Sequence, residues 1–180
     1  EQDRLDLEHH IFRLILGGSL FRSPITRSPQ RVLDMGTGTG IWAIDFADEF
    51  PSAEVTGNDL SPIQPLWVAP NCRFIVDDLE SPWLYKRSEP FDFIHGRAIA
   101  GSIKDWPQLY KQIYKHLKPG GWIEIQDYEG TLRSDEDPEL YHAPSIAQWQ
   151  ALVDKASTQL GQKLDVAGEQ KQHMIDAGFV

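Results

Sequence analysis

A glycine-rich stretch near the start of the chain constrains its fold more than any other feature. Residues 31–42 read Arg-Val-Leu-Asp-Met-Gly-Thr-Gly-Thr-Gly-Ile-Trp, a short apolar run that ends in three alternating glycines and continues into a helical pattern. Glycine permits positive φ values and close approach of the backbone to a ligand, and the N-terminus of the following helix favours negative charge. The stretch therefore predicts a strand, a ligand-binding turn and a helix.

Similar strand and helix patterns follow along the chain. Apolar runs predict strands at residues 31–35, 54–57, 73–76, 91–95 and 122–126, and amphipathic runs predict helices at 41–50 and 107–117. This alternation predicts an α/β fold with a mostly parallel sheet. A further helix is expected at residues 4–16, as a lid or as a packing helix. The apolar stripe from Ile146 to Leu160 predicts a core helix, and Asp165 and Gly178 are expected to begin and end the last helix.

Composition and charge exclude several classes of protein. The chain has 180 residues, 41% of them hydrophobic and 24% charged, which is typical of one globular domain. A formal net charge of −10 argues against extended nucleic-acid binding. We expect no membrane span, because no apolar run approaches the roughly 18 residues that a span needs. We expect no disulfide and no metal site, because Cys72 is the single cysteine and the adjacent His9 and His10 would point about 100° apart on a helix. These features predict a soluble protein of a reducing compartment with a buried thiol.

The spacing of the glycines narrows the choice of ligand. A dinucleotide fingerprint requires Gly-x-Gly-x-x-Gly, and Ile41 stands where its third glycine belongs. A phosphate-binding loop requires a Gly-Lys-Ser/Thr ending, which the stretch lacks. An NAD-dependent oxidoreductase is therefore a weaker interpretation.

Carboxylates follow the next two predicted strands. Asp59 follows the second strand, and a carboxylate there can accept hydrogen bonds from both hydroxyls of a ribose. Residues 77–80, Asp-Asp-Leu-Glu, follow the third strand, where a side-chain carboxylate and an adjacent backbone N–H can meet the amino group and ring nitrogen of an adenine. Because the carboxyl ends of parallel strands meet at one edge of a sheet, we expect the glycine loop and both acids to lie close together.

Several separated stretches resemble one protein family. Residues 32–42 resemble motif I of class I S-adenosylmethionine-dependent methyltransferases, and residues 116–124 resemble the segment before their fifth strand. Residues 4–6 with His10, and residues 57–65, 77–83 and 100–106, resemble the fungal LaeA-like methyltransferases, which are associated with regulation of secondary metabolism and development. The resemblance covers about residues 4–130 and is only generic from Arg133 onward.

The resemblance implies a Rossmann-like methyltransferase fold with S-adenosyl-L-methionine as cofactor. It assigns the methionine portion to Asp34 and the loop of Gly36, Thr37, Gly38, Thr39 and Gly40, the ribose to Asp59, and the adenine to Asp78 with the Leu79 backbone. Leu60 is expected to contact the cofactor as well. We expect one domain over residues 1–180, from the length of the chain and the absence of a long linker, with a lid region at 1–28, a cofactor-binding core at 29–130 and C-terminal helices at 131–180. Since the family fold closes with a sixth and a seventh strand, we expect this C-terminal β6/β7 hairpin to be missing here.

Methyl transfer from a sulfonium is an in-line displacement, so alignment of the reactants matters more than acid–base chemistry. His95, after the fourth strand, is expected to contact the cofactor or the backbone, or else to be a weak candidate for a general base. Arg97 is expected to contact the cofactor or to form an ordinary salt bridge. Trp67, Trp83 and Trp106 are expected to pack in the core or to line a pocket for the cation.

We therefore expect an S-adenosylmethionine-dependent methyltransferase that acts on a protein or a small metabolite in the regulation of fungal secondary metabolism or development. The alternative is a regulatory subunit that keeps the cofactor-binding fold and acts through protein association. The resemblance implies a protein partner, of the velvet type, no direct nucleic-acid contact, and a cytoplasmic or nuclear location.

Overall fold

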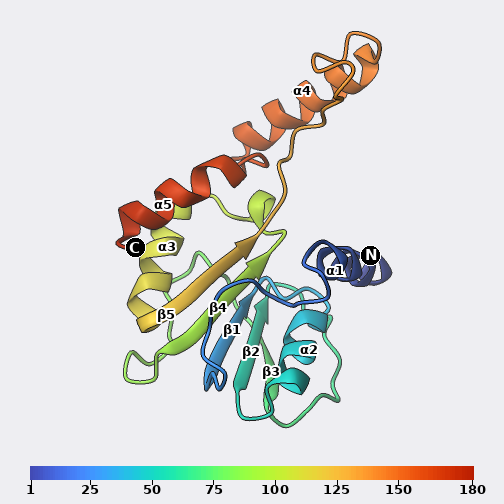
Figure 1. Ribbon diagram of the computed structural model, residues 1–180. Coiled ribbons are helices and arrows are strands. Elements are labelled where there is room, and N and C mark those ends of the chain that lie inside the picture. The colour runs from blue at the N-terminus through green and yellow to red at the C-terminus, as the bar shows by residue number, and fades with distance from the viewer. The chain divides into compact units, whose positions relative to one another are not determined.

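The computed structural model describes residues 1–180, and the chain divides into two compact units. The first unit contains residues 1–97 and 111–126, and the second contains residues 98–110 and 127–180. The helices are α1 (Gln2–Ile15), α2 (Ile41–Glu49), α3 (Trp106–His116), α4 (Pro144–Gln159) and α5 (Gln170–Ala177), with 3₁₀ turns at Ala100–Ser102 and Ala167–Glu169 (Figure 1). The strands are β1 (Arg31–Met35), β2 (Glu54–Asp59), β3 (Cys72–Val76), β4 (Phe91–Arg97) and β5 (Leu117–Gln126). No helix combines the length and the apolar character that crossing a bilayer requires.

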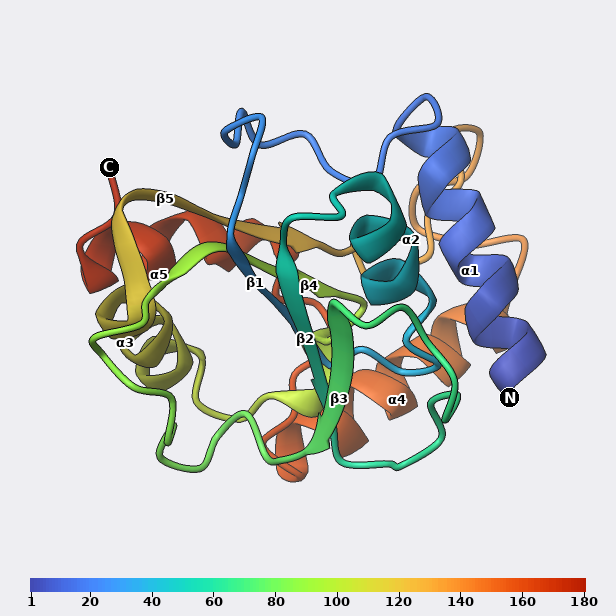
Figure 2. The ribbon, with the colours of Figure 1, turned by 90° about the horizontal axis from the view of Figure 1, so that it is seen from below.

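The first unit is built on a five-stranded parallel sheet. Its strand order is β3-β2-β1-β4-β5, so the chain crosses from one side of β1 to the other between β3 and β4 (Figure 2). Open parallel sheets bind their ligands at the carboxyl ends of the strands where the order reverses in this way. The predicted α/β fold is confirmed, and the strand order indicates a binding site at the carboxyl ends of β1 and β4.

Strand β5 differs from its predicted bounds. The sequence of residues 118–121, Lys-Pro-Gly-Gly, predicts a stop before a strand at Trp122, whereas β5 already begins at Leu117. Its register with β4 shifts between the pairs Phe91–Leu117 and Phe93–Trp122, so the four intervening residues bulge out of the ladder. Gly120 lies in this bulge with a φ of +78°, which glycine adopts without steric cost.

The core of the first unit lies between α2 and the sheet. Trp42 and Phe46 of α2 are fully buried, and their rings stack with centroids 5.0 Å apart. The indole N–H of Trp42 donates to the carbonyl of Leu20 at 3.0 Å. The free thiol of Cys72 is buried beside them, as predicted, and this burial raises its pKa to about 11, which disfavours the reactive thiolate. The buried residues of this core are Leu20, Val32, Trp42, Ala43, Phe46, Ala47, Ala53, Val55, Cys72 and Phe93.

Helix α4, in the second unit, departs from its prediction. Its apolar stripe predicts core packing, yet no residue of α4 is buried. The side chains of Ile146, Trp149 and Leu152 have exposed fractions of 46%, 58% and 59%, and Leu160, just past the helix, has 69%. The prediction is wrong because helical spacing shows which side chains share a face, whereas burial depends on what covers that face.

The last helix starts later than predicted. Asp165 is not its N-cap, because α5 begins at Gln170 and the Asp165 carboxylate instead accepts a hydrogen bond from the Thr131 hydroxyl at 2.8 Å. Gly178 ends α5 in the left-handed conformation with a φ of +106°, and this part of the prediction is confirmed.

Candidate functional site

The glycine loop connects the end of β1 to the start of α2. Gly36, Gly38 and Gly40 have φ values of +63°, +58° and +83°, in the left-handed region that favours glycine. At Gly40 a side chain would also have no room, because a Cβ there would lie 2.4 Å from Cζ of Phe74. The positive end of the α2 dipole follows the loop directly. The loop is therefore a compact, glycine-dependent backbone turn at the end of the central strand.

Asp59 ends β2 beside this loop. Its Oδ2 accepts a hydrogen bond from the N–H of Gly38 at 2.8 Å, and its Oδ1 accepts one from the N–H of Ser61 at 2.9 Å. The side chain is half-buried. Since each carboxylate oxygen has two lone pairs, both oxygens can accept a further hydrogen bond from a ligand hydroxyl.

Asp34, on β1, lies beneath the loop and is 2% exposed. Its Oδ2 accepts a hydrogen bond from the Thr37 hydroxyl at 2.5 Å, and its Oδ1 lies 2.7 Å from Nδ1 of His95. A buried carboxylate costs several kcal/mol unless it is paired and hydrogen-bonded. The contacts with Thr37 and His95 therefore offset the cost of burying this carboxylate under the loop.

His95 faces Asp34 across the β1–β4 pairing and has no exposed surface. Its ring stacks on that of Trp42, with centroids 3.7 Å apart and 4° between the planes. Its Nδ1 contacts Asp34, and its Nε2 has no hydrogen-bond partner. The polar contact of His95 within the protein is thus with the Asp34 side chain, where a backbone contact was expected. A general base must touch the group whose proton it removes, and this buried ring has no exposed surface for such a contact.

The remaining predicted residues lie at the ends of neighbouring strands. Leu60 follows Asp59 and is 69% exposed, so it offers apolar surface beside that carboxylate. Asp78 is exposed after β3. Leu79 is buried, and its carbonyl accepts a hydrogen bond from the Trp83 indole N–H at 3.0 Å. The loop and Asp78 thus follow β1 and β3, and Asp59 ends the intervening strand β2, so all three lie at the carboxyl ends of adjacent strands as the sequence predicts.

Arg97 ends β4 and contacts helix α1. Its Nη2 lies 3.0 Å from Nδ1 of His9, and its guanidinium carbon lies 5.2 Å from the centre of the Phe12 ring. Within the protein its hydrogen-bond partner is therefore a histidine of α1 and not the carboxylate of an ordinary salt bridge. Its contact with the cofactor stays a prediction.

The three tryptophans proposed for packing or for a pocket differ in burial. Trp83 and Trp106 have exposed fractions of 8% and 4%, which confirms the packing expectation for both. Trp67 is 95% exposed in the loop between β2 and β3, so for this residue the packing expectation is wrong.

Two contacts that fix the surroundings of the loop could not be predicted from the sequence. Asp6 of α1 accepts a hydrogen bond from the Thr39 hydroxyl at 2.7 Å, and the amide of Gln64 donates to the Gly38 carbonyl at 2.6 Å. Figure 2 shows α1 beside α2. Both residues lie in stretches that carry the family resemblance, but no spacing rule relates them to a loop that is far away in the sequence.

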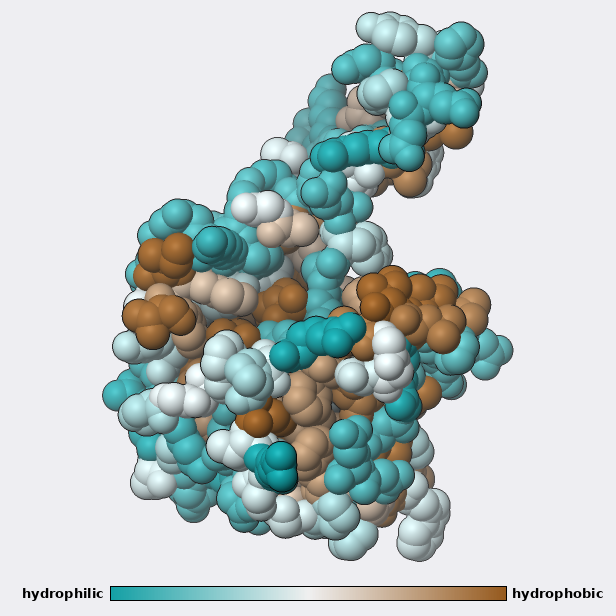
Figure 3. Space-filling model, in the orientation of Figure 1, coloured by the Kyte–Doolittle hydropathy of each residue, from teal (hydrophilic) through white to brown (hydrophobic).

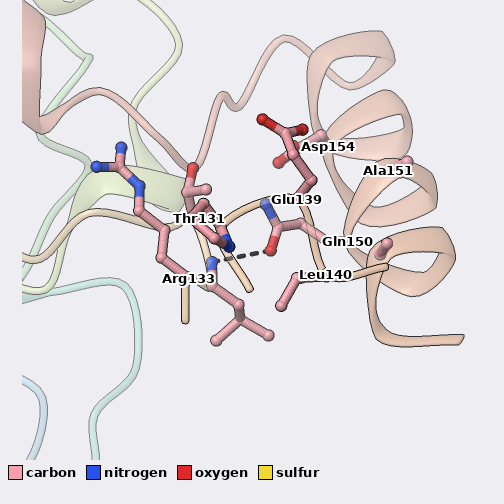
Figure 4. A pocket seen from close by; sticks show the side chains of 10 residues that line it. Thr131, Arg133, Glu139, Leu140, Gln150, Ala151 and Asp154 are labelled. Atoms are coloured by element: carbon pink, nitrogen blue, oxygen red, sulfur yellow. Dashed lines mark hydrogen bonds between the residues drawn. The ribbon is translucent and has the colours of Figure 1, made fainter. Parts of the chain in front are cut away.

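The second unit contains a separate pocket of about 520 Å³ between residues 131–140 and α4 (Figure 4). At its wall the N–H of Leu132 donates to Oε1 of Gln150 at 2.8 Å. Its lining residues are Thr131, Leu132, Arg133, Pro138, Glu139, Leu140, Ala147, Gln150, Ala151 and Asp154. None of the predicted binding residues is among them, so we place the candidate site at the carboxyl edge of the sheet.

Comparison with known proteins identifies the family. The family described as "Methyltransferase domain" matches residues 7–173 of this chain. The chain belongs to this methyltransferase family. "Methyltransferase pytC" from Aspergillus terreus is 45% identical over 180 residues, covering 99% of this chain and 55% of that protein. "Secondary metabolism regulator LAE1" from Cochliobolus heterostrophus is 40% identical over 185 residues, covering 100% of this chain and 60% of that protein.

A solved structure supports the same assignment. Phosphoethanolamine N-methyltransferase 2 from Haemonchus contortus, in complex with S-adenosyl-L-methionine, superimposes with a TM-score of 0.62 at 27% identity, over 87% of this chain and 34% of that chain. The predicted LaeA-like class I methyltransferase resemblance and the Rossmann-like fold are confirmed. The chain spans a little over half the length of the curated relatives.

Proposed function

We propose that this chain is an S-adenosyl-L-methionine-dependent methyltransferase domain, spanning residues 1–180, that acts on a protein or small-metabolite acceptor. The observation that carries this proposal is the junction of the glycine loop with Asp59, whose carboxylate lies 2.8 Å from the N–H of Gly38. A loop with positive φ values lets a ligand approach the backbone, and the carboxylate beside it suits a ribose. These are the requirements of an adenosine cofactor.

The residues at the sheet edge fit this cofactor. Asp34 with residues 36–40 would hold its methionine portion, Asp59 with Leu60 its ribose, and Asp78 with Leu79 its adenine. When bound, S-adenosyl-L-methionine supplies a methyl group on a positively charged sulfur. The residues of the chain bind and orient the reactants and exclude water, and no covalent enzyme intermediate is required.

We predict that the chain binds S-adenosylhomocysteine and not NAD. Asp59 can accept ribose hydroxyls in either ligand, but Ile41 occupies the position where a dinucleotide loop needs its third glycine. The measurement is calorimetry with each ligand under identical conditions. Tight binding of NAD, with none of S-adenosylhomocysteine, would overturn the assignment in favour of an oxidoreductase.

We predict that His95 supports the site without being an indispensable base. The ring has no exposed surface for an acceptor to touch, and Asp34 occupies its Nδ1. At saturating cofactor, His95→Ala is expected to reduce tritiated methyl transfer into fungal cell extract by less than about 100-fold, since loss of a general base costs about 10²–10⁴-fold.

His95→Asn serves as the matched variant because its amide keeps an N–H donor for Asp34. We expect it to lose less activity than the alanine variant. Complete loss of transfer in both folded, cofactor-saturated variants would instead show that His95 takes part in proton transfer.

A regulatory role through protein association is the second candidate function, and exposed apolar surface favours it. Helix α1 presents Leu7, Ile11, Leu14 and Ile15 with exposed fractions of 59%, 47%, 66% and 69%, seen as an apolar patch in Figure 3. Patches of this kind mark protein interaction sites. We propose a protein partner of the velvet type and a place in the cytoplasm or nucleus for this role.

Methyl incorporation into extract separates the two candidates. A catalytic domain is expected to label a component of the extract above a heat-inactivated control, and this labelling should disappear in Asp59→Ala. A subunit that acts only by association would bind S-adenosylhomocysteine and label nothing.

A further inference from the structure

Helix α1 covers the glycine loop through its first half. Leu5 lies over Gly38, since a Cβ on that glycine would be 3.4 Å from Cδ1 of Leu5. The Thr39 hydroxyl donates to Asp6, and the amide of Gln2 donates to the carbonyl of Ile63 at 3.4 Å. These polar contacts are exposed to solvent, where single hydrogen bonds contribute little net stability. Holding the helix over the loop requires a firmer attachment.

His9 provides this attachment and is the one residue of α1 that is buried, at 3% exposure. Its Nε2 lies 3.1 Å from Oδ2 of Asp45 on α2, and its Nδ1 lies 3.0 Å from Nη2 of Arg97 on β4. A carboxylate only accepts hydrogen bonds and a guanidinium only donates them. The partners therefore require Nε2 to carry the proton and Nδ1 to accept, so the imidazole is neutral.

The charges that face His9 come from three elements. Arg97 faces it from β4 and Asp45 from α2, and Arg13 of α1 itself donates to the same Asp45 oxygen at 2.9 Å. Burial, and then the positive charge of Arg97, lower the pKa of His9, and these effects outweigh the opposing effect of Asp45. A proton on Nδ1 would place two donors against each other at the contact with Arg97.

We propose that His9 is a positioning residue that fixes α1 over the cofactor loop, and that only its neutral form can do so. This inference rests on the proposed cofactor site. It adds that α1 covers this site only while His9 is neutral. Arg97 is the second residue of this attachment. It ends β4, the strand next to β1, and on α1 it contacts the His9 ring nitrogen and the Phe12 ring. Protonation of His9 breaks its bond to Arg97 and frees α1 from the loop.

The sign of the pH effect follows from linkage. The closed helix lowers the pKa of His9, whereas a freed, solvated His9 returns to its ordinary value near 6.5. The open form therefore binds the proton more tightly, and the closed form is fully favoured only above that ordinary value. Cofactor affinity should fall as the pH drops below about 6.5, by up to about tenfold per pH unit for one proton.

The test compares the wild-type chain with His9→Gln and His10→Gln between pH 5.5 and 7.5. Glutamine at position 9 offers an amide donor for Asp45 and a carbonyl acceptor for Arg97 but does not titrate. His10 is the matched control, since it is the neighbouring exposed histidine of α1. The two readouts are S-adenosylhomocysteine affinity by calorimetry and hydrogen exchange of the α1 amides without ligand.

We expect the wild type and His10→Gln to lose affinity and α1 protection together toward pH 5.5, and His9→Gln to show a flat profile in both. A wild-type pH slope that persists in His9→Gln would overturn the proposal, as would α1 protection that does not depend on pH in the wild type. If S-adenosylhomocysteine binds at no pH, the proposed function fails, while the exchange profile still tests the His9 attachment by itself.

Discussion

Replacing Asp59 by alanine is expected to lower the affinity for S-adenosylhomocysteine by about 10- to 100-fold. The charged contact between this carboxylate and the ribose would contribute about 1.5–3 kcal/mol as a whole, and every 1.4 kcal/mol corresponds to a factor of ten. The carboxylate would bind the ribose hydroxyls and also holds the Gly38 N–H at 2.8 Å and the Ser61 N–H at 2.9 Å. Its removal thus weakens both the ligand contact and the order of the loop.

Glu54→Ala is the matched control for this change. Glu54 starts β2, at the opposite end of the same strand, and is exposed. Calorimetry should show wild-type affinity for Glu54→Ala, and thermal unfolding should show that both variants are folded. Unchanged affinity in a folded Asp59→Ala protein would remove Asp59 from the cofactor site.

Replacing Gly40 by alanine is expected to destabilise the first unit by about 2–5 kcal/mol and to abolish cofactor binding. A left-handed backbone costs an ordinary residue about 1–2 kcal/mol, and forcing an extra group into a filled core costs about 1–3 kcal/mol more. Both apply here, because Gly40 has a φ of +83° and a new Cβ would lie 2.4 Å from the Phe74 ring. Either the loop or the ring must move.

Gly120→Ala separates these two costs. Gly120 has a nearly equal φ of +78°, but no atom lies within 4 Å of a Cβ placed there. Denaturant unfolding should therefore show a loss of about 1–2 kcal/mol for Gly120→Ala, which is the backbone cost alone. Equal losses in the two variants would mean that contact with Phe74 does not constrain the glycine loop.

Much of the fold could be predicted from local sequence. The run at residues 31–35 between Pro29 and Gly36 predicted β1 with its observed bounds, and Gly178 predicted the end of α5. These features depend on backbone conformation and on the period of apolar residues, which neighbouring residues carry. Residues 118–121 predicted a break before the last strand. In the structure β5 pairs with β4 on both sides of these residues, so they form a bulge within the strand.

The positions of the candidate site residues could also be predicted from local sequence. The alternating glycines and the acids after the following strands are local signals, and the parallel topology brings them to one edge. The partners of those residues were not predictable. His95 and Asp34 are 61 positions apart, and Arg97 and His9 are 88 positions apart. No sequence pattern predicts contacts at these separations.

The sequence by itself therefore determined where the strands, the glycine turn and the acidic side chains occur, because each depends on residues that are adjacent in the chain. Only the tertiary structure decided that His95 is enclosed between Asp34 and Trp42, that His9 is the buried residue of α1, and that the stripe of α4 is exposed. The physical reason is that periodicity defines which side chains share a face of a helix or strand. Burial, and with it the protonation state of a histidine, depends on which distant element covers that face.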